Sequence, residues 1–188
     1  MNQPLTRNTL GRTGLEVTNL GYGAMEIRGG SRGREVSDEE AGIILNAVLD
    51  AGINFIDTSI DYGRSEELIG ERISHRRSEF YLASKCGCAA IPEAAGEHIF
   101  TRENIVAGVE QSLKRMRTDH LDIVQFHSSP SKAAIDDDDA IQTLLDLKEQ
   151  GKIRFLGSSS TLPNLAGHVE MGVFDEFQIP YSGLSREH

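Results

Sequence analysis

The chain has 188 residues, which is the size of a single domain. Its formal net charge is -10 at pH 7, and this acidic balance argues against nucleic acid or an anionic membrane surface as a partner. No window of about 18 apolar residues occurs, so no membrane span is expected. The N-terminus lacks the apolar core of a secretory signal, and we therefore expect a cytoplasmic protein.

The N-terminal part of the chain predicts a β-hairpin followed by a first core strand. Residues 7–18 place a glycine-bearing turn between two short apolar runs, which is typical of a hairpin. Residues 20–25 follow as the strand, and their glycines indicate close approach by another group. A helix is then predicted from its cap at Ser37, with acidic residues in the first turn, to its end at Gly52.

The remainder of the chain alternates strands with helices. The predicted strands are residues 54–57, 79–85, 121–127, 153–157 and 176–181. The intervening helices are predicted to begin at the caps Ser65 and Thr101, at the exposed acidic run 136–139 and near Pro163. Such alternation means a parallel sheet with right-handed crossovers, although spacing alone does not separate a closed barrel from an open sheet.

Three successive strands end in an ionisable side chain. These are Asp57, Lys85 and His127, and Tyr62 follows five residues after the first of them. Parallel α/β folds place their chemistry at such strand ends, and three in a row suit the catalytic rim of a barrel. Taken singly, Asp57 and Lys85 fit a structural ion pair, and His127 fits a core histidine. Together the four residues favour a catalytic site.

Two cysteines follow the third predicted core strand. Cys86 and Cys88 form one Cys-x-Cys pair without a second pair of ligands, so no metal ligands are predicted. Reduced cytosolic thiols are the preferred interpretation, and a redox-sensitive site is the alternative. Both cysteines lie in a predicted loop, residues 86–100, whose length is typical of a lid or a substrate wall. Neither a Gly-x-Gly-x-x-Gly turn opening a helix nor a Walker-type phosphate loop is present.

Several motifs together match one family. They are the hairpin through Gly11 and Gly14 and residues 20–23, 57–66, 84–85, 121–127, 157–160 and 177–182. Through these motifs the chain resembles the aldo-keto reductases over almost its whole length. The resemblance implies a (β/α)8 barrel of the TIM type with an N-terminal β-hairpin. A complete barrel needs about 250 residues. We therefore expect one domain, residues 1–188, with about six of the eight parallel strands and without strands seven and eight.

The resemblance also implies an activity, the reduction of an aldehyde or ketone to an alcohol by hydride transfer from NADPH. The family's catalytic tetrad falls on Asp57, Tyr62, Lys85 and His127. Tyr62 would donate a proton to the carbonyl oxygen, and the Lys85 ammonium would ease the release of that proton. Asp57 would pair with Lys85, and His127 would donate a hydrogen bond to the substrate oxygen.

The cofactor positions come from the same resemblance. The matching residues are Gly23, Met25, Asp57, Ser159, Ser160 and Gln178. The last three would hold the nicotinamide carboxamide, which presents both a donor and an acceptor. At Ser160 the family often has Asn, which reaches further. The preference for NADPH over NADH rests on the family, because the region that selects the phosphate follows the eighth strand there.

Two alternatives to an active reductase remain open. The chain could be a truncated barrel fragment with little or no activity, and its open sheet edges would then favour self-association. It could instead be a nucleotide-binding regulatory subunit, as some relatives of the family are. The intact tetrad favours the enzyme, whose partner would be a small carbonyl compound that the sequence does not specify.

Overall fold

The computed structural model describes residues 4–29, 35–90, 98–137, 139–184 and 186–187. Six parallel strands within them form one curled sheet in the order β3-β4-β5-β6-β7-β8. The strands are β3 (Tyr22–Gly23), β4 (Phe55–Asp57), β5 (Tyr81–Cys86), β6 (Leu121–Phe126), β7 (Ile153–Ser159) and β8 (Glu176–Gln178). Each strand pairs with its neighbour in the chain, which is the topology of a (β/α) barrel and confirms the predicted incomplete barrel.

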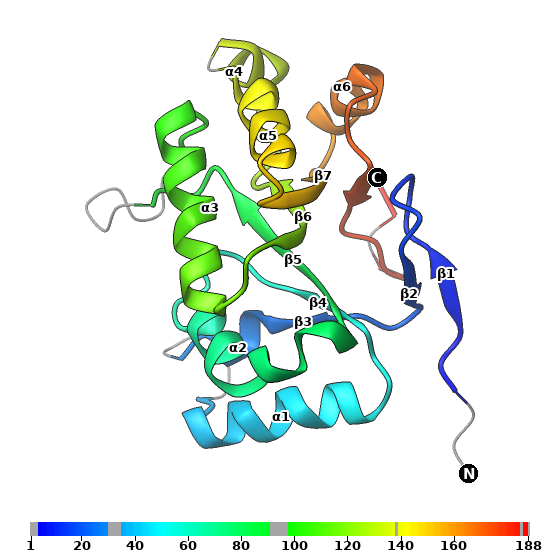
Figure 1. The fold of residues 1–188 in the computed structure, drawn as a ribbon. Coiled ribbons are helices and arrows are strands. Elements are labelled where there is room, and N and C mark those ends of the chain that lie inside the picture. Colours follow the sequence, from blue (N-terminus) through cyan, green and yellow to red (C-terminus); the bar gives the residue numbers. More distant parts are fainter. Residues whose placement is uncertain (1–3, 30–34, 91–97, 138, 185, 188) are drawn as a thin grey trace.

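Helices connect the strands and cover the outer side of the sheet (Figure 1). They are α1 (Asp38–Asp50), α2 (Ser65–Ile73), α3 (Arg102–Met116), α4 (Lys132–Asp137), α5 (Ala140–Glu149) and α6 (Asn164–Met171), with 3-10 turns η1 (Ala24–Ile27) and η2 (Ser74–Glu79). The predicted caps of α1 and α3 are confirmed, because the hydroxyls of Ser37 and Thr101 accept from the amides of Glu40 and Asn104. No helix in the described ranges is long and apolar enough to cross a bilayer.

The core lies between the sheet and the helices. All six residues of β6 are buried, as expected of a parallel strand covered on both faces. Its Phe126 ring packs edge-on against Phe100 and Phe174, and the buried face of the helices contributes Leu45 and Ile105. One continuous apolar cluster therefore fixes the strands at a common level and brings their carboxyl ends to one rim.

The predicted hairpin is confirmed by the antiparallel pair β1 (Arg7–Thr9) and β2 (Glu16–Thr18). Its turn lies against the segment before β8, where the Arg12 amide donates to the Asp175 carbonyl at 2.7 Å. Gly11, at φ +49°, allows this approach, because a Cβ there would lie 2.2 Å from the Asp175 carbonyl oxygen. The hairpin also bonds Asn54, through the Thr18 amide at 2.7 Å, so it bridges the amino-terminal ends of β4 and β8.

The N-terminal half of the sequence prediction needs two corrections. The first core strand was predicted over residues 20–25, but β3 covers only Tyr22–Gly23 and the chain turns at once into η1, which contains Met25. Ser65 does not cap α2. It is the first residue of the helix, and its buried hydroxyl donates to the Ala24 carbonyl at 2.8 Å, so it ties α2 to η1.

The C-terminal half differs in three places. The acidic run 136–139 spans the end of α4 and the N-cap of α5, with residue 138 outside the described residues, so one predicted helix start is a junction of two helices. The last strand ends at Gln178 rather than at residue 181, and Pro180 follows. The predicted loop 86–100 begins later, because Cys86 belongs to β5. Residues 91–97 of that loop lie outside the described residues.

Two helical glycines give a matched test of the packing between α2 and α3. A Cβ at Gly70 would lie 2.0 Å from the Arg115 carbonyl oxygen, which is fixed backbone. A Cβ at Gly42 in α1 would lie 3.1 Å from the flexible Arg72 side chain. We predict that Gly70→Ala lowers the free energy of unfolding by about 1–3 kcal/mol through overpacking. Gly42→Ala should raise it by about 0.5–1 kcal/mol through helix propensity. Urea unfolding measures both, and equal effects would contradict the close α2–α3 contact.

Candidate active site

A buried ion pair stands at the centre of the rim. Lys85, at the end of β5, donates from Nζ to Asp57 Oδ2 at 2.7 Å and to the Thr58 carbonyl at 2.8 Å. The Lys85 side chain is only 1% exposed. The second carboxylate oxygen, Oδ1 of Asp57, accepts from Gln125 Nε2 at 3.0 Å. Both oxygens of the acid and two of the three ammonium protons therefore have partners, as a buried pair requires.

Tyr62 lies directly beside this pair. The Lys85 ammonium is 5.1 Å from the centre of the Tyr62 ring, within the range of a cation–π contact. The turn that carries Tyr62 is closed by hydrogen bonds on both sides, from the Tyr62 amide to the Ser59 carbonyl and from the Ser65 amide to the Tyr62 carbonyl. Gly63 follows at φ +49°, and any Cβ there would lie 2.4 Å from the Arg28 carbonyl oxygen. The turn therefore holds the phenol over the ion pair.

His127 completes the group from the far side of Tyr62. The two rings meet edge to face, with centroids 6.0 Å apart and an interplanar angle of 78°. The His127 amide donates to the Cys86 carbonyl at 3.1 Å, which continues the ladder one residue beyond β6. Its Nδ1 lies 3.0 Å from Cys88 Sγ, and the ring is partly buried. The structure thus brings together all four residues of the predicted tetrad.

The electrostatics of the site fix the protonation states of Tyr62 and His127 at neutral pH. Burial, followed by the charges of Asp57 and Asp61, raises the pKa of Tyr62 to about 12. The lowering of this pKa that was expected from Lys85 is not seen in the resting site, because burial and the two acids dominate. Burial also lowers the pKa of His127. At neutral pH the site therefore offers a protonated phenol beside an uncharged imidazole.

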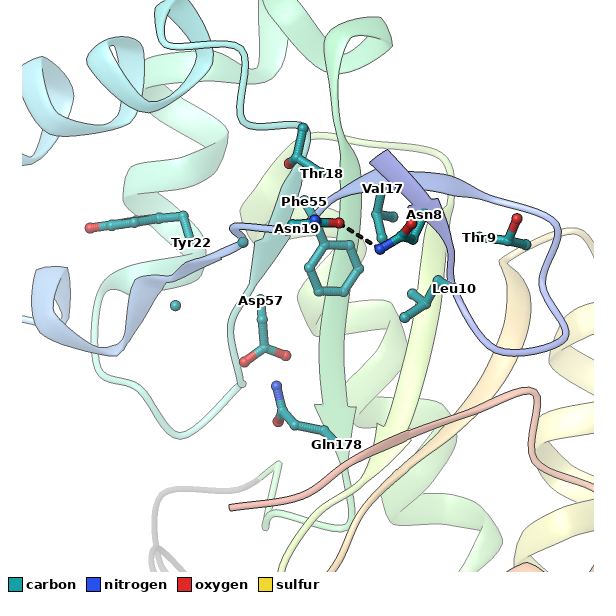
Figure 2. A pocket seen from close by; sticks show the side chains of 12 residues that line it. Asn8, Thr9, Leu10, Val17, Thr18, Asn19, Tyr22, Phe55, Asp57 and Gln178 are labelled. Atoms are coloured by element: carbon teal, nitrogen blue, oxygen red, sulfur yellow. Dashed lines mark hydrogen bonds between the residues drawn. The ribbon is translucent and has the colours of Figure 1, made fainter. Parts of the chain in front are cut away.

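A pocket of about 560 Å³ opens on the inner side of the sheet (Figure 2). The hairpin forms one wall, and β3, β4 and β8 contribute three of the residues predicted to bind the cofactor, namely Gly23, Asp57 and Gln178. Figure 2 shows the Asp57 carboxylate and the Gln178 amide turned toward one another. The Gln178 side chain has no hydrogen-bond partner among the described residues, so its donor and acceptor are both available to a ligand amide.

The other predicted cofactor residues lie elsewhere. Ser159 and Ser160 line a second hollow of about 300 Å³ together with His127. The Ser160 hydroxyl is buried and lies 2.6 Å from Ser129 Oγ, so it already has a protein partner. Met25 lies in η1, is 38% exposed and lines neither hollow. The structure therefore divides the predicted cofactor positions between two neighbouring hollows and leaves Met25 outside both.

Sequence reasoning missed two polar residues inside the barrel. Gln125 precedes His127 by two positions, so the period of a strand already placed it on the same face. Glu176 gave no such signal. It is 6% exposed, and its Oε1 has no hydrogen-bond partner in the described part of the chain. The carboxylate lies over Gly157, where a Cβ would come within 1.9 Å of Oε1. Burial and then the Asp57 charge raise the pKa of Glu176 to about 8.

The model of the aldo/keto reductase family matches residues 19–174, which include the whole predicted tetrad. The chain belongs to this family. Two relatives from Bacillus subtilis show the same likeness in sequence. The oxidoreductase YqkF, which is named as uncharacterised, is 32% identical over 164 residues, and the aldo-keto reductase YhdN is 32% identical over 181 residues.

This aldo/keto reductase chain is shorter than those relatives. The match to YqkF covers 86% of this chain and 51% of YqkF, and the match to YhdN covers 93% and 53%. The chain therefore spans about half the length of these curated relatives. Among solved structures, the aldo-keto reductase AKR11C1 of Bacillus halodurans superimposes with a TM-score of 0.81 at 27% identity. That match covers 95% of this chain and 58% of AKR11C1. The fold and the family are thus established independently.

The buried Glu176 predicts a pH dependence of stability. In the unfolded chain its pKa is near 4.5, and in the fold it is about 8, so folding binds a proton between these values. The stability of the native protein should therefore fall, relative to Glu176→Gln, by up to about 1.4 kcal/mol for each pH unit as the pH rises through this window. Urea unfolding of both proteins at several pH values measures the difference, and parallel curves would contradict the raised pKa.

Proposed function

We propose that this chain serves an NADPH-dependent reduction of aldehydes or ketones to alcohols, with Tyr62 as the proton donor. The single observation that carries the proposal is the position of the Lys85 ammonium, which contacts Asp57 at 2.7 Å and faces the Tyr62 ring at 5.1 Å. A cation held this way stabilises the negative charge that a phenol acquires when it gives up its proton. A structural ion pair has no need of a phenol over it.

The side chains suggest the following division of work. NADPH, when bound, supplies a hydride to the carbonyl carbon. The carbonyl oxygen gains the displaced electron pair and takes the proton of Tyr62, so that one C–H bond and one O–H bond form. Lys85 stabilises the phenolate until solvent returns the proton. His127, uncharged at neutral pH, donates a hydrogen bond from one ring nitrogen and orients the substrate oxygen.

The pocket beside Asp57 fits the nicotinamide end of such a cofactor. The unpartnered amide of Gln178 matches a carboxamide, and Ser159, on the adjacent strand, stands opposite it in the register. The choice of NADPH over NADH comes from the family resemblance. One Escherichia coli relative, 28% identical over 194 residues, is named NADH-specific methylglyoxal reductase, so both dinucleotides belong in the assays.

The remaining proposals concern the chain as a whole. We propose one domain over residues 1–188, a cytoplasmic location and a small carbonyl compound as substrate. We also propose self-association through the ends of the sheet, where β3 and β8 lie.

The main test is the removal of the Tyr62 hydroxyl. Tyr62→Phe keeps the ring over Lys85 but takes away the proton, so we predict that carbonyl-dependent NADPH oxidation falls by about 100-fold or more. Tyr81→Phe is the matched control, because Tyr81 begins β5 at the opposite end of the sheet. Steady-state kinetics with several aldehydes give the comparison. Equal rates for Tyr62→Phe and the native chain would refute the proposed proton donor.

A regulatory subunit is the second candidate. A rice protein named "Probable voltage-gated potassium channel subunit beta" is 32% identical over 133 residues, which cover 68% of this chain. Such a subunit would bind the dinucleotide without turnover. The tetrad geometry makes the enzyme the better supported of the two.

Titration of NADPH fluorescence, compared with the turnover assay, distinguishes the enzyme, the regulatory subunit and the inactive fragment. We predict binding that Gln178→Ala weakens by about tenfold, the cost of one or two hydrogen bonds. The control Gln142→Ala should leave it unchanged, because Gln142 is exposed on α5, where its side chain bonds Asp146. Binding without turnover would favour the regulatory subunit, and no binding would favour the inactive fragment. Sedimentation of the same samples measures self-association, and a strictly monomeric chain would contradict that proposal.

A further inference from the structure

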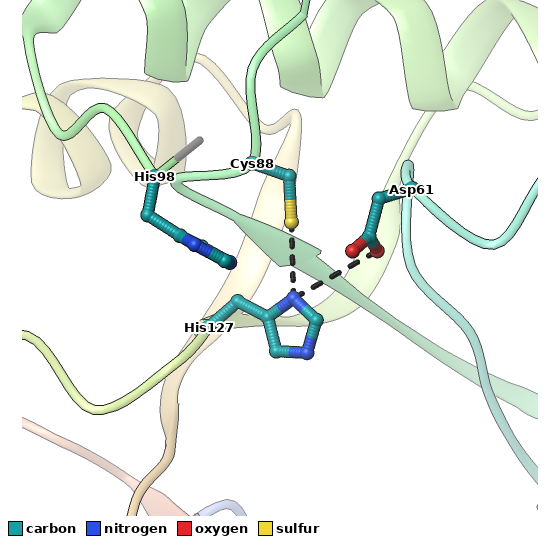
Figure 3. Close-up of side chains that lie close together, drawn as sticks. All are labelled: Asp61, Cys88, His98 and His127. Atoms are coloured by element: carbon teal, nitrogen blue, oxygen red, sulfur yellow. Dashed lines mark hydrogen bonds and ion pairs between the residues drawn. The ribbon is translucent and has the colours of Figure 1, made fainter. Parts of the chain in front are cut away.

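Four side chains with metal-binding donors converge at the rim (Figure 3). They are Asp61, Cys88, His98 and His127, and one donor atom from each lies within 4.8 Å of all the others. Asp61 lies in the segment after β4, and His127 directly follows β6. Cys88 and His98 both lie between β5 and α3. An isolated β-bridge pairs Cys88 with His98 and holds the two residues side by side across the loop.

The distances within the cluster suit a small cation. Cys88 Sγ is 3.0 Å and Asp61 Oδ1 is 3.8 Å from His127 Nδ1. The rings of His98 and His127 meet edge to face at 5.4 Å between centroids. Ligand atoms around a tetrahedral zinc stand about 3.3–3.7 Å apart, given bonds of about 2.0–2.3 Å. Side-chain shifts of about 1 Å at most would therefore complete the coordination.

Neighbouring hydroxyl groups hold the donor side chains in place. The Ser59 hydroxyl donates to Asp61 Oδ1 at 2.5 Å and lies 3.6 Å from Cys88 Sγ, so it contacts two of the four donors. Ser128 Oγ lies 2.7 Å from Nε2 of His98. Hydrogen bonds that orient ligand side chains are typical of metal sites. The Asp61 side chain is 38% exposed, which leaves an ion a route from solvent.

The Cys88 sulfur has only weak partners within the protein. It lies 3.0 Å from His127 Nδ1 and 3.6 Å from the Ser59 hydroxyl, and a thiol is a weak donor and acceptor. A divalent cation would replace the thiol proton, because coordination deprotonates a thiol, and the proton would leave to solvent. Two neutral imidazoles, a thiolate and a carboxylate would leave a zinc complex without net charge.

We propose that this cluster binds one zinc ion, with Asp61, Cys88, His98 and His127 as its four ligands. A set of two nitrogens, one sulfur and one oxygen in a compact arrangement suits Zn²⁺, whereas magnesium and calcium select oxygen donors. The proposal rests on the ligand geometry alone and does not require reductase activity.

Zinc at this position would also act on His127. The ion takes Nδ1, and Figure 3 shows the other ring nitrogen turned away from the cluster. A metal on Nδ1 obliges Nε2 to carry the remaining proton, which fixes the ring as a hydrogen-bond donor. His127 would thus belong to two sites, with one nitrogen for the metal and one for the open side of the rim.

Cobalt substitution tests the proposal without any activity assay. The reduced, chelator-treated chain is titrated with CoCl2. We expect one equivalent to produce the intense visible bands of tetrahedral cobalt together with a thiolate-to-cobalt band in the near ultraviolet. Addition of ZnCl2 should bleach both. A spectrum that stays that of octahedral aqueous cobalt would overturn the site.

Matched variants identify the ligands. Cys88→Ser should abolish the thiolate band, and Cys86→Ala should keep it, because Cys86 packs in the apolar core instead. His98→Ala should weaken cobalt binding at least tenfold. His120→Ala should leave it unchanged, because His120 lies just before β6 and pairs with Asp119 instead. The thiolate band persisting in Cys88→Ser, or equal affinities for the two histidine variants, would reject the assigned ligands. Circular dichroism of each variant checks that it is folded.

Discussion

The fold and the candidate site share one constraint, the need of a buried ammonium for a partner. Lys85 is almost wholly removed from water, and a lone charge in that position would cost several kcal/mol. Its partner Asp57 ends the adjacent strand, and the register that pairs Asp57 with Ala83 brings the two side chains within 2.7 Å. A slip of one residue would turn Asp57 to the other face of the sheet and leave the ammonium unpaired. The register that pairs β4 with β5 therefore also assembles the site.

Much of this arrangement could be predicted from the sequence, for a simple reason. Parallel strands of a barrel end at one rim, so a reactive residue at the end of each strand needs no further information to find its neighbours. Asp57, Lys85 and His127 could be placed by pattern alone, and Tyr62 stood out five residues after Asp57. The family resemblance indicated the fold, which the family match confirms. The roles of these residues stay predictions that the proposed experiments address.

The features that the sequence did not predict depend on the environment of side chains and on turns. A pattern of residue types along the sequence contains neither. The pKa of Tyr62 rises instead of falling, because burial dominates and the charges of Asp57 and Asp61 raise it further. Met25 leaves the strand because the chain turns into a 3-10 helix two residues early. The cluster around Cys88 could not be predicted, because its donors come from separate segments of the chain rather than from a spaced motif.

The carboxylate of Glu176 occupies the space that a Cβ at position 157 would need. These two sites, on adjacent strands, must therefore be redesigned as a unit. A methyl group at 157 becomes tolerable only when the acid opposite is shortened and the Gln125 side chain, whose Cγ would lie 2.8 Å from the new Cβ, also shifts. A shorter residue at 176 on its own leaves a void in the barrel interior. A larger residue at 157 combined with a smaller apolar residue at 176 would keep the filled volume between β7 and β8 similar. The combination would replace an ionisable side chain in the barrel interior with an apolar one.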